Sequence, residues 1–281
     1  MNYILLVISF LCNVSLAVFD KKSSTKISGN NQVLTFSFLK TFFCFLFALA
    51  FLPLGEHHIT KIGVFIALLG GVAHAVSVIL IMWCLKKTKA VYVNLVMSSG
   101  IIFPAFYGFI FLNQAFSFLK LFFLLFLIFA MALTLSIKVG EKFNLMFLIP
   151  MFISYGVLMT VQGVFPKYCE NGSKMFFSVI MYGFSALILG VATLIKVKEF
   201  TPFKKDVICI CVWLSFLNLA LNVLLTTVSA SLPAIIVFPS VHGLKLVVIT
   251  LISSFLWKEK LTKLQYIGCL LSTVCICVLS V

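Results

Sequence analysis

Residues 234 to 256 read AIIVFPSVHGLKLVVITLISSFL. This stretch is long enough for an α-helix to cross the hydrocarbon core of a bilayer, which takes about 20 apolar residues. Its one formal charge, Lys245, lies near the middle, about 16 Å from either end at 1.5 Å per residue. A central lysine costs roughly 2.5 to 3.5 kcal/mol, so it usually marks a substrate path, an ion path or a paired counter-charge.

The composition extends this interpretation to the whole chain. Of its 281 residues, 63% are hydrophobic and 10% are charged, which leaves too little polar surface for a soluble globule. The apolar runs are continuous, whereas the strands of a membrane β-barrel would alternate. We therefore predict an all-α polytopic membrane protein. Its ten transmembrane helices are expected near residues 2 to 19, 33 to 53, 62 to 85, 90 to 112, 117 to 138, 144 to 165, 174 to 195, 206 to 228, 232 to 256 and 261 to 281.

The lysines predict an orientation. The net charge is +14, but the lysines fall almost entirely in loops, so no nucleic-acid partner is expected. Fifteen lysines follow odd-numbered spans and four follow even-numbered spans. The positive-inside rule then places the odd-numbered loops in the cytoplasm and both termini outside. We expect a multi-pass protein of a bacterial inner or plasma membrane.

The chain also echoes itself at an offset of 145 residues. The stretch LNQAFS at 112–117 corresponds to WKEKLT at 257–262, and each follows a proline-containing span and precedes a terminal apolar run. This pattern predicts two five-helix repeats, residues 1–140 and 141–281. Because each repeat has an odd number of spans, the second is inverted in the membrane. Inverted repeats are typical of secondary transporters, whose sites lie near the midplane between the repeats.

Polar residues inside the spans define a candidate site. All seven acidic residues lie in loops or at span ends, so no carboxylate is expected to neutralise Lys245. The remaining explanations are a neutral amine, hydration in a cavity or an anionic ligand. Lys40 is expected to extend toward the nearer membrane face. The polar side chains must avoid lipid, and we predict that they converge on one wet interior. The predicted substrate-binding residues are Lys245, His242, Asn222, Asn218, His74 and Asn94.

Simpler roles stay open for several of these residues. Asn and Ser pairs often join neighbouring helices without binding a ligand. His74, beside Gly70 and Gly71, can form a hydrogen bond across a tight helix contact. The sequence has no H-E-x-x-H, no G-x-S-x-G and no Gly-rich phosphate loop. The scattered cysteines do not chelate from one helix face. We therefore expect no catalytic residue, no cofactor and no metal.

The stretch FLWKEKLTKLQYIG at 255–268 resembles the link between the last two helices of the drug/metabolite transporter superfamily, in its EamA-like branch. The residues that fall on the family pattern are Lys258, Glu259, Leu261, Thr262, Gln265 and Gly268. The stretch SFLKTF at 37–42 looks like the family's Leu-Arg-Phe entry to the second helix, with lysine for arginine. The resemblance implies an inverted pair of five-helix bundles around a central cavity. Lys245 also looks like the anion-binding lysine of the family's sugar-phosphate and nucleotide-sugar branches.

Together these features predict a secondary transporter that moves a small polar metabolite, anionic or zwitterionic, by alternating access. It would work in the lipid bilayer as a monomer or homodimer. Proton coupling would fall to His74 or His242, or the protein would exchange solutes without it. Two other classes remain open. A carrier or flippase of lipid-linked headgroups predicts a lateral opening between helices. A non-transporting membrane scaffold predicts that the polar side chains pair with one another and leave no cavity.

Overall fold

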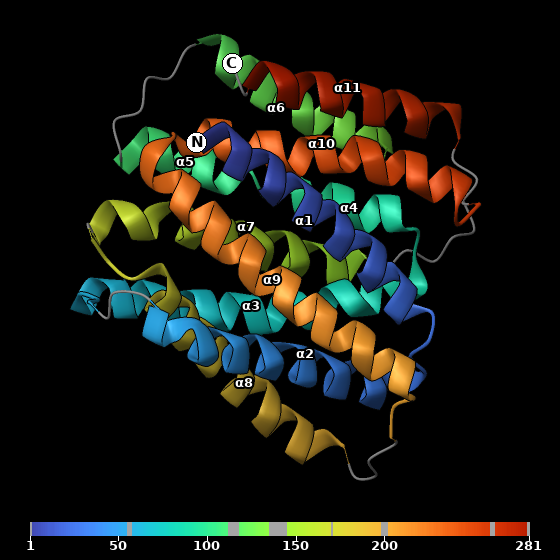
Figure 1. The fold of residues 1–281 in the computed structure, drawn as a ribbon. Helices are drawn as coiled ribbons and strands as arrows, with labels where there is room; N and C mark the ends of the chain where they lie inside the picture. Colours follow the sequence, from blue (N-terminus) through green and yellow to red (C-terminus); the bar gives the residue numbers. More distant parts are fainter. Residues whose placement is uncertain are drawn as a thin grey trace.

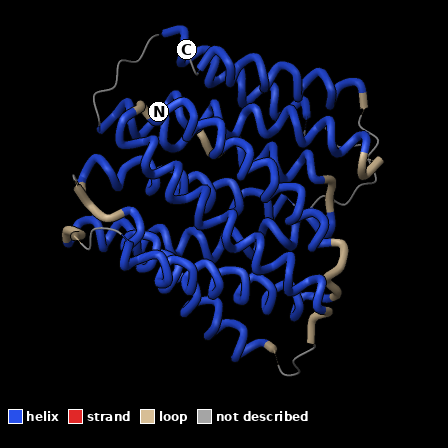
Figure 2. The backbone as a smooth tube through the Cα atoms, viewed as in Figure 1, coloured by secondary structure: helices blue, strands red, loops and turns tan. Residues whose placement is uncertain are grey.

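The protein is an all-helical, multi-pass membrane protein. Its structure, a computed structural model, describes residues 2–54, 58–111, 118–134, 145–169, 171–197, 202–258 and 262–279. Within these residues the secondary structure consists of helices and the turns between them (Figure 2). Eight helical segments among the described residues are long and apolar enough to cross a membrane. The predicted class of fold is therefore confirmed at this level.

The described chain forms eleven α-helices (Figure 1). The long apolar runs make helices because in lipid each backbone amide must find its partner within the same segment. The first set comprises α1 (Asn2–Ser24), α2 (Gly29–Phe51), α3 (Lys61–Lys87), α4 (Ala90–Ser99), α5 (Ile102–Phe111) and α6 (Phe118–Thr134), with a 3-10 turn at Leu52–Leu54. The second set comprises α7 (Leu145–Tyr168), α8 (Lys174–Lys196), α9 (Lys205–Ser231), α10 (Ala234–Phe255) and α11 (Lys263–Leu279).

The first two helices extend beyond the predicted spans by four residues or more. α1 continues to Ser24, whereas the apolar run was expected to end at residue 19. α2 begins at Gly29, four residues before the predicted start. Both extensions matter for the site, because they place Asp20 inside a helix and Lys40 at the middle of one.

The fourth predicted span is broken into α4 and α5. Pro104 has no amide hydrogen to donate to the carbonyl of Gly100, and Phe103 instead donates to that carbonyl at 3.0 Å. α7 crosses the break closely. A Cβ atom added at Gly100 would lie 3.1 Å from the Cα atom of Gly156, and one added at Gly156 would lie 2.3 Å from the ring of Phe103. The two glycines therefore let the backbones approach, as small residues do in membrane helix pairs.

Helix lengths recur along the chain. α2 and α8 have 23 residues each, α3 and α9 have 27 each, and α6 and α11 are described over 17 each. The broken span and α10 have 22 each, and α1 and α7 have 23 and 24. Each helix of the second set begins between 143 and 145 residues after its counterpart in the first. The spacing agrees with the sequence echo.

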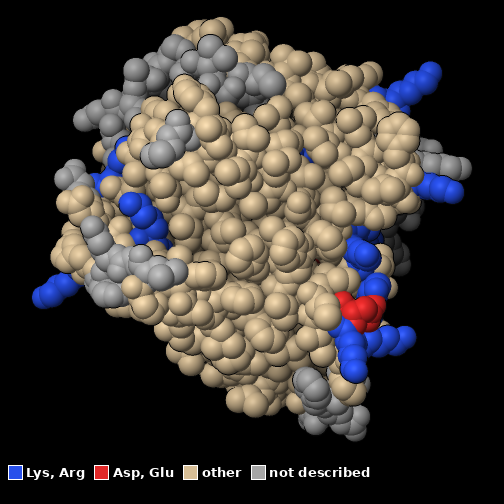
Figure 3. All heavy atoms as spheres, in the orientation of Figure 1, with Lys and Arg blue, Asp and Glu red and all other residues tan. Residues whose placement is uncertain are grey.

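The two sets interleave instead of forming separate bundles (Figure 1). α1 packs on α9 and α10, α2 on α8 and α9, α3 on α7 and α8, and α6 on α11. The N-terminal end of α1 and the C-terminal end of α11 lie at the same end of the molecule. Figure 3 shows a face whose middle is covered by uncharged residues, with lysine side chains near its edges. Large apolar side chains such as Phe65, Leu194 and Phe255 are highly exposed, as expected for a surface in contact with lipid.

Candidate functional site

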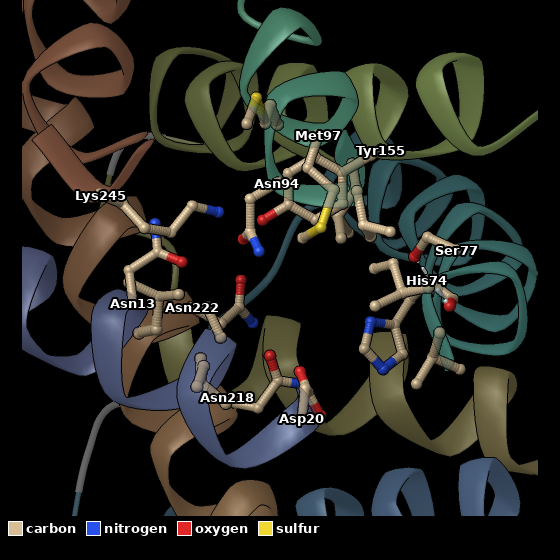
Figure 4. Close-up of a pocket in the computed structure, with 18 of the residues that line it drawn as sticks. Asn13, Asp20, His74, Ser77, Asn94, Met97, Tyr155, Asn218, Asn222 and Lys245 are labelled. Carbon is tan, nitrogen blue, oxygen red and sulfur yellow. Dashed lines mark hydrogen bonds between the residues drawn. The ribbon is translucent and has the colours of Figure 1, made fainter. Parts of the chain in front are cut away.

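A largely enclosed cavity lies among α1, α2, α3, α4, α7, α9 and α10. Its volume is about 60 Å³, which is several times the roughly 10 to 15 Å³ that one water molecule needs. Its wall mixes apolar side chains with many polar ones (Figure 4). The polar lining residues are Asn13, Asp20, Lys40, His74, Ser77, Asn94, Tyr155, Gln162, Asn218, Asn222 and Lys245. The volume and lining suit a small polar ligand.

Lys245 is the group in this wall with the strongest need for a ligand. Its side chain is fully buried, with 0% of its surface exposed. Its Nζ atom has no hydrogen-bond partner anywhere in the described chain, and it lies 6.0 Å from the centre of the Tyr155 ring. In Figure 4 the amine points into the cavity on the side of Asn94. Because an isolated buried cation is costly, a charged Lys245 requires water or an anion in this cavity.

No carboxylate was expected to neutralise Lys245, and none bonds to it within the described chain, but Asp20 lies in the wall of the same cavity. Asp20 lies four residues before the end of α1, is 8% exposed and lines the same cavity as Lys245. Lys40 donates a hydrogen bond from Nζ to the Oδ1 atom of Asp20 at 2.7 Å. The cavity therefore contains a buried ion pair that the apolar pattern did not reveal.

Lys40 was expected to extend toward the nearer membrane face, but its amine is held inside the protein by Asp20. Lys40 lies 11 residues from either end of α2, and only 4% of its surface is exposed. Helical side chains lean toward the N-terminus of their own helix. α2 begins beside the end of α1, so the Lys40 side chain reaches back toward Asp20.

The formal charge of the cavity wall is +1. Two lysines and one aspartate are the charged residues among its described lining. Lys40 holds the Asp20 carboxylate, and the charge of Asp20 also acts on Lys245, without a contact between them. One positive charge therefore remains uncompensated, and an anion would neutralise it.

His242 was predicted to bind substrate but does not line the cavity. It is 1% exposed, and its Nδ1 atom lies 3.2 Å from the Nδ2 atom of Asn13 in a hydrogen bond. Its ring packs edge-on against Tyr155 and is stacked near Phe238. His242 thus lies behind the wall and holds Asn13, which does line it.

His74 and Asn94 both line the cavity, as predicted. His74 lies across the cavity from Lys245 in Figure 4. Its Nε2 atom is 3.5 Å from the Oγ1 atom of Thr41, and its ring meets Tyr182 edge-on at 5.0 Å. The Nδ2 atom of Asn94 donates to the carbonyl of Ala90 at 2.9 Å, which fixes the amide against its own helix. The carbonyl oxygen of Asn94 is then available to a ligand.

Asn222 and Asn218 also line the cavity, but both take part in contacts between helices. Asn222 accepts a hydrogen bond from Gln162 at 2.8 Å and donates one to Ser178 at 3.0 Å, which ties α9 to α7 and α8. The Nδ2 atom of Asn218 approaches the sulfur of Cys44 at 3.7 Å. Asn222 therefore joins helices, because both its amide oxygen and its amide nitrogen have partners within the protein.

A periodic signal for Asp20 exists in the sequence. Asn13, Ala17 and Asp20 are spaced as residues on one face of a helix, and all three line the cavity. Asp20 shares this face only if the first helix continues past Phe19. The apolar run ends at Phe19, so hydropathy alone predicts a helix that stops before Asp20.

No family model matches the chain, and no curated protein matches it. Among solved structures, one described only as "Crystal structure of protein" is similar over 99% of this chain and 98% of its own. The TM-score is 0.68 and the sequence identity is 12%. At this identity the similarity shows a shared fold over nearly the whole length.

Proposed function

We propose that the protein is a secondary transporter that moves a small anionic or zwitterionic metabolite by alternating access. The observation that carries this proposal is the unpartnered Nζ atom of Lys245, fully buried within the described structure, in a polar cavity large enough for a few waters. A buried charge without a partner is costly to keep for stability alone. Such a charge is expected in a binding site where a ligand supplies its partner.

The proposed architecture is a pair of inverted five-helix repeats, residues 1–140 and 141–281. The recurring helix lengths support it, and so does the packing. In such a repeat α1 corresponds to α7 and α3 to α9. The packing of α1 on α9 therefore requires packing of α7 on α3, which is also present. The packing of α2 on α9 likewise requires that of α8 on α3, and that of α1 on α10 requires that of α7 on α4 and α5, which are also present. The cavity is lined by helices of both sets, as in transporters whose repeats rock around a central site.

The cavity wall suggests how a substrate would be held. Lys245 would bind its negative end, and the amide groups of Asn13 and Asn94 would orient its polar groups. The wall carries a net charge of +1, so a ligand with one uncompensated negative charge gives a neutral complex. A neutral complex avoids the cost of a net charge in the membrane interior.

The two other classes are less well supported. Two apolar grooves, of about 290 and 510 Å³, lie among α3, α5 and α7 and share no lining residue with the polar cavity. A carrier of lipid-linked headgroups needs a lateral route from lipid to the polar site, so this separation counts against it. A scaffold would pair its polar side chains with one another, as Asn222 does and Lys245 does not within the described residues.

We further propose that the transporter is related to the EamA-like branch of the drug/metabolite transporters, that it lies in a bacterial inner or plasma membrane, and that both termini are outside. The motif at 255–268 and the distribution of lysines support these points.

The test uses purified protein in lipid nanodiscs and proteoliposomes. Small carboxylates, amino acids and inorganic phosphate are screened for thermal stabilisation, and uptake is then measured for those that bind. We expect at least one anionic compound to bind the wild type and Lys196→Gln, a control at an exposed lysine. Lys245→Gln should lose binding and uptake of that compound. Equal uptake by Lys245→Gln and the wild type would refute the assigned role of Lys245.

A further inference from the structure

The Asp20–Lys40 ion pair lies in the wall of the cavity that also holds Lys245. Asp20 is the single carboxylate among the lining residues that the structure describes. Its side chain is 11% exposed and that of Lys40 is 5% exposed. Any ligand that enters the cavity therefore comes near two lysines, of which one is already occupied by Asp20.

A purely structural role is a poor explanation of this pair. Removing two charges from water costs about as much as their attraction returns, so apolar side chains of similar volume often serve equally well. The pair also borders open space and is not packed within a core. Its position suits a group that changes partner when a ligand binds.

The charge of the wall shows what such a change would do. With Asp20 ionised, the wall carries +1 and matches a monoanion. With a proton on Asp20, the ion pair ends, Lys40 becomes available, and the wall carries +2. A dianion would then leave the cavity neutral, which is the favourable state within a membrane.

Asp20 is the group of the cavity wall whose protonation would release a second lysine. His74 is held by Thr41 and Tyr182 next to Lys40, and a second positive charge there would be repelled. The titratable and charged groups that face Asp20, or act on it, from the neighbouring helices are Lys40 and Cys44 (α2), His74 (α3), Tyr155 (α7), Cys211 (α9) and Lys245 (α10). The lining residues of α4 are Val93, Asn94 and Met97, which do not titrate.

We propose that Asp20 is a proton-binding site, and that the cavity takes up a doubly charged anion together with one proton. The proton adds to the Asp20 carboxylate, the ion pair with Lys40 ends, and Lys40 joins Lys245 in binding the anion. This inference rests on the proposed function, because it uses the same cavity. It assigns proton coupling to Asp20, and not to the histidines suggested by the sequence.

Sulfate and nitrate are suitable probes because neither changes its charge between about pH 5 and pH 8, whereas carboxylates and histidines titrate in or near that range. Binding to the protein in nanodiscs is measured by isothermal calorimetry in two buffers of different ionisation enthalpy, which yields the number of protons taken up. We expect sulfate to bind with about one proton and nitrate with none. The affinity for sulfate should fall about tenfold per pH unit once Asp20 is ionised in the free protein.

Three variants identify the group that takes up the proton. Asp20→Asn should bind sulfate without proton uptake and without dependence on pH, because the amide cannot titrate and leaves Lys40 free. Asp20→Glu should retain the uptake. Asp206→Asn, which removes an exposed carboxylate paired with Lys26 outside the cavity, should behave as the wild type. Proton uptake that persists in Asp20→Asn, or sulfate binding without uptake in the wild type, would overturn the inference.

Infrared spectroscopy separates this inference from the proposed function. A protonated carboxyl group has its own C=O stretching band, and the difference between wild type and Asp20→Asn isolates that of Asp20 without any ligand. We expect the band to appear as the pH is lowered. If neither anion binds the wild type, the anion site of the proposed function fails, and the proposal of coupled uptake fails with it. If the anions bind and the Asp20 band is absent at every pH, only the proton site is rejected.

Discussion

Replacing Lys245 by methionine should stabilise the folded protein while it abolishes anion binding. Lys245 is fully buried, and its Nζ atom has no partner within the described chain. A buried polar group without a partner costs about 1 to 3 kcal/mol, and a lysine at the centre of a span about 2.5 to 3.5 kcal/mol. Methionine fills a similar space without a charge. Because water in the cavity offsets part of the cost, we expect a gain of about 1 to 3 kcal/mol.

The same substitution at Lys40 should have the opposite effect. Lys40 is paired with Asp20 at 2.7 Å, and both side chains are almost completely buried. Removing one member of a buried pair leaves an uncompensated charge and costs about 3 to 5 kcal/mol. Methionine should therefore raise the free energy of unfolding at Lys245 and lower it at Lys40. The reason is that Lys40 is paired with Asp20, whereas Lys245 has no partner within the described chain.

The measurement is reversible unfolding in mixed micelles, with the free energy of unfolding compared among wild type, Lys245→Met and Lys40→Met. The two variants control for each other, since the change of side chain is identical. A loss of stability in Lys245→Met similar to that in Lys40→Met would refute the reasoning, because it would mean that Lys245 has a stabilising partner in the ligand-free protein.

Three further outcomes are expected. The double variant Asp20→Asn/Lys40→Met should recover most of the stability lost in Lys40→Met, and additive effects in a double-mutant cycle would argue against the ion pair. Gly156→Ala should destabilise by about 1 to 3 kcal/mol, since the new methyl group would lie 2.3 Å from an aromatic ring. Thermal unfolding should show a smaller loss for Gly190→Ala, where the nearest atom is 3.1 Å away, at the edge of a ring. A reporter fused after Val281 should be active outside the cytoplasm, and cytoplasmic activity would reverse the proposed orientation.

The course of the helices and part of the site could be predicted from the sequence for one physical reason. Lipid excludes both unpaired backbone amides and polar side chains. Apolar runs of about 20 residues therefore become helices, and polar residues at helical spacing turn away from lipid. For this reason Lys245, His74 and Asn94, which belong to three different helices, line one cavity.

The ion pair could not be predicted in this way, because hydropathy reports where residues become polar and not where a helix ends. The apolar run of the first helix stops at Phe19, and the charged residues Asp20, Lys21 and Lys22 follow. In the structure the helix continues for another turn and carries Asp20 with it. Whether the Lys40 side chain meets Asp20 depends on how α1 and α2 are turned about their axes, and hydropathy does not report that.

His242 shows a second limit. Three residues before Lys245, it is displaced by about 60° around the helix, which is near enough to suggest one face. Whether both side chains reach the same cavity is decided by the neighbouring helices. Tyr155 and Asn13 meet the histidine ring, and the lysine extends past them into open space.

The charge of the cavity wall has a consequence for the energetics of transport under a membrane voltage. Moving one elementary charge through 100 mV is worth about 2.3 kcal/mol. In the proposed mechanism the loaded cavity is neutral, so the step that carries the substrate is nearly indifferent to voltage. The empty cavity keeps its formal charge of +1 from Lys40, Lys245 and Asp20, and its return is the step that an electric field would drive or oppose. Under a voltage that is negative inside, the empty carrier would therefore favour the conformation that brings this charge closest to the cytoplasm.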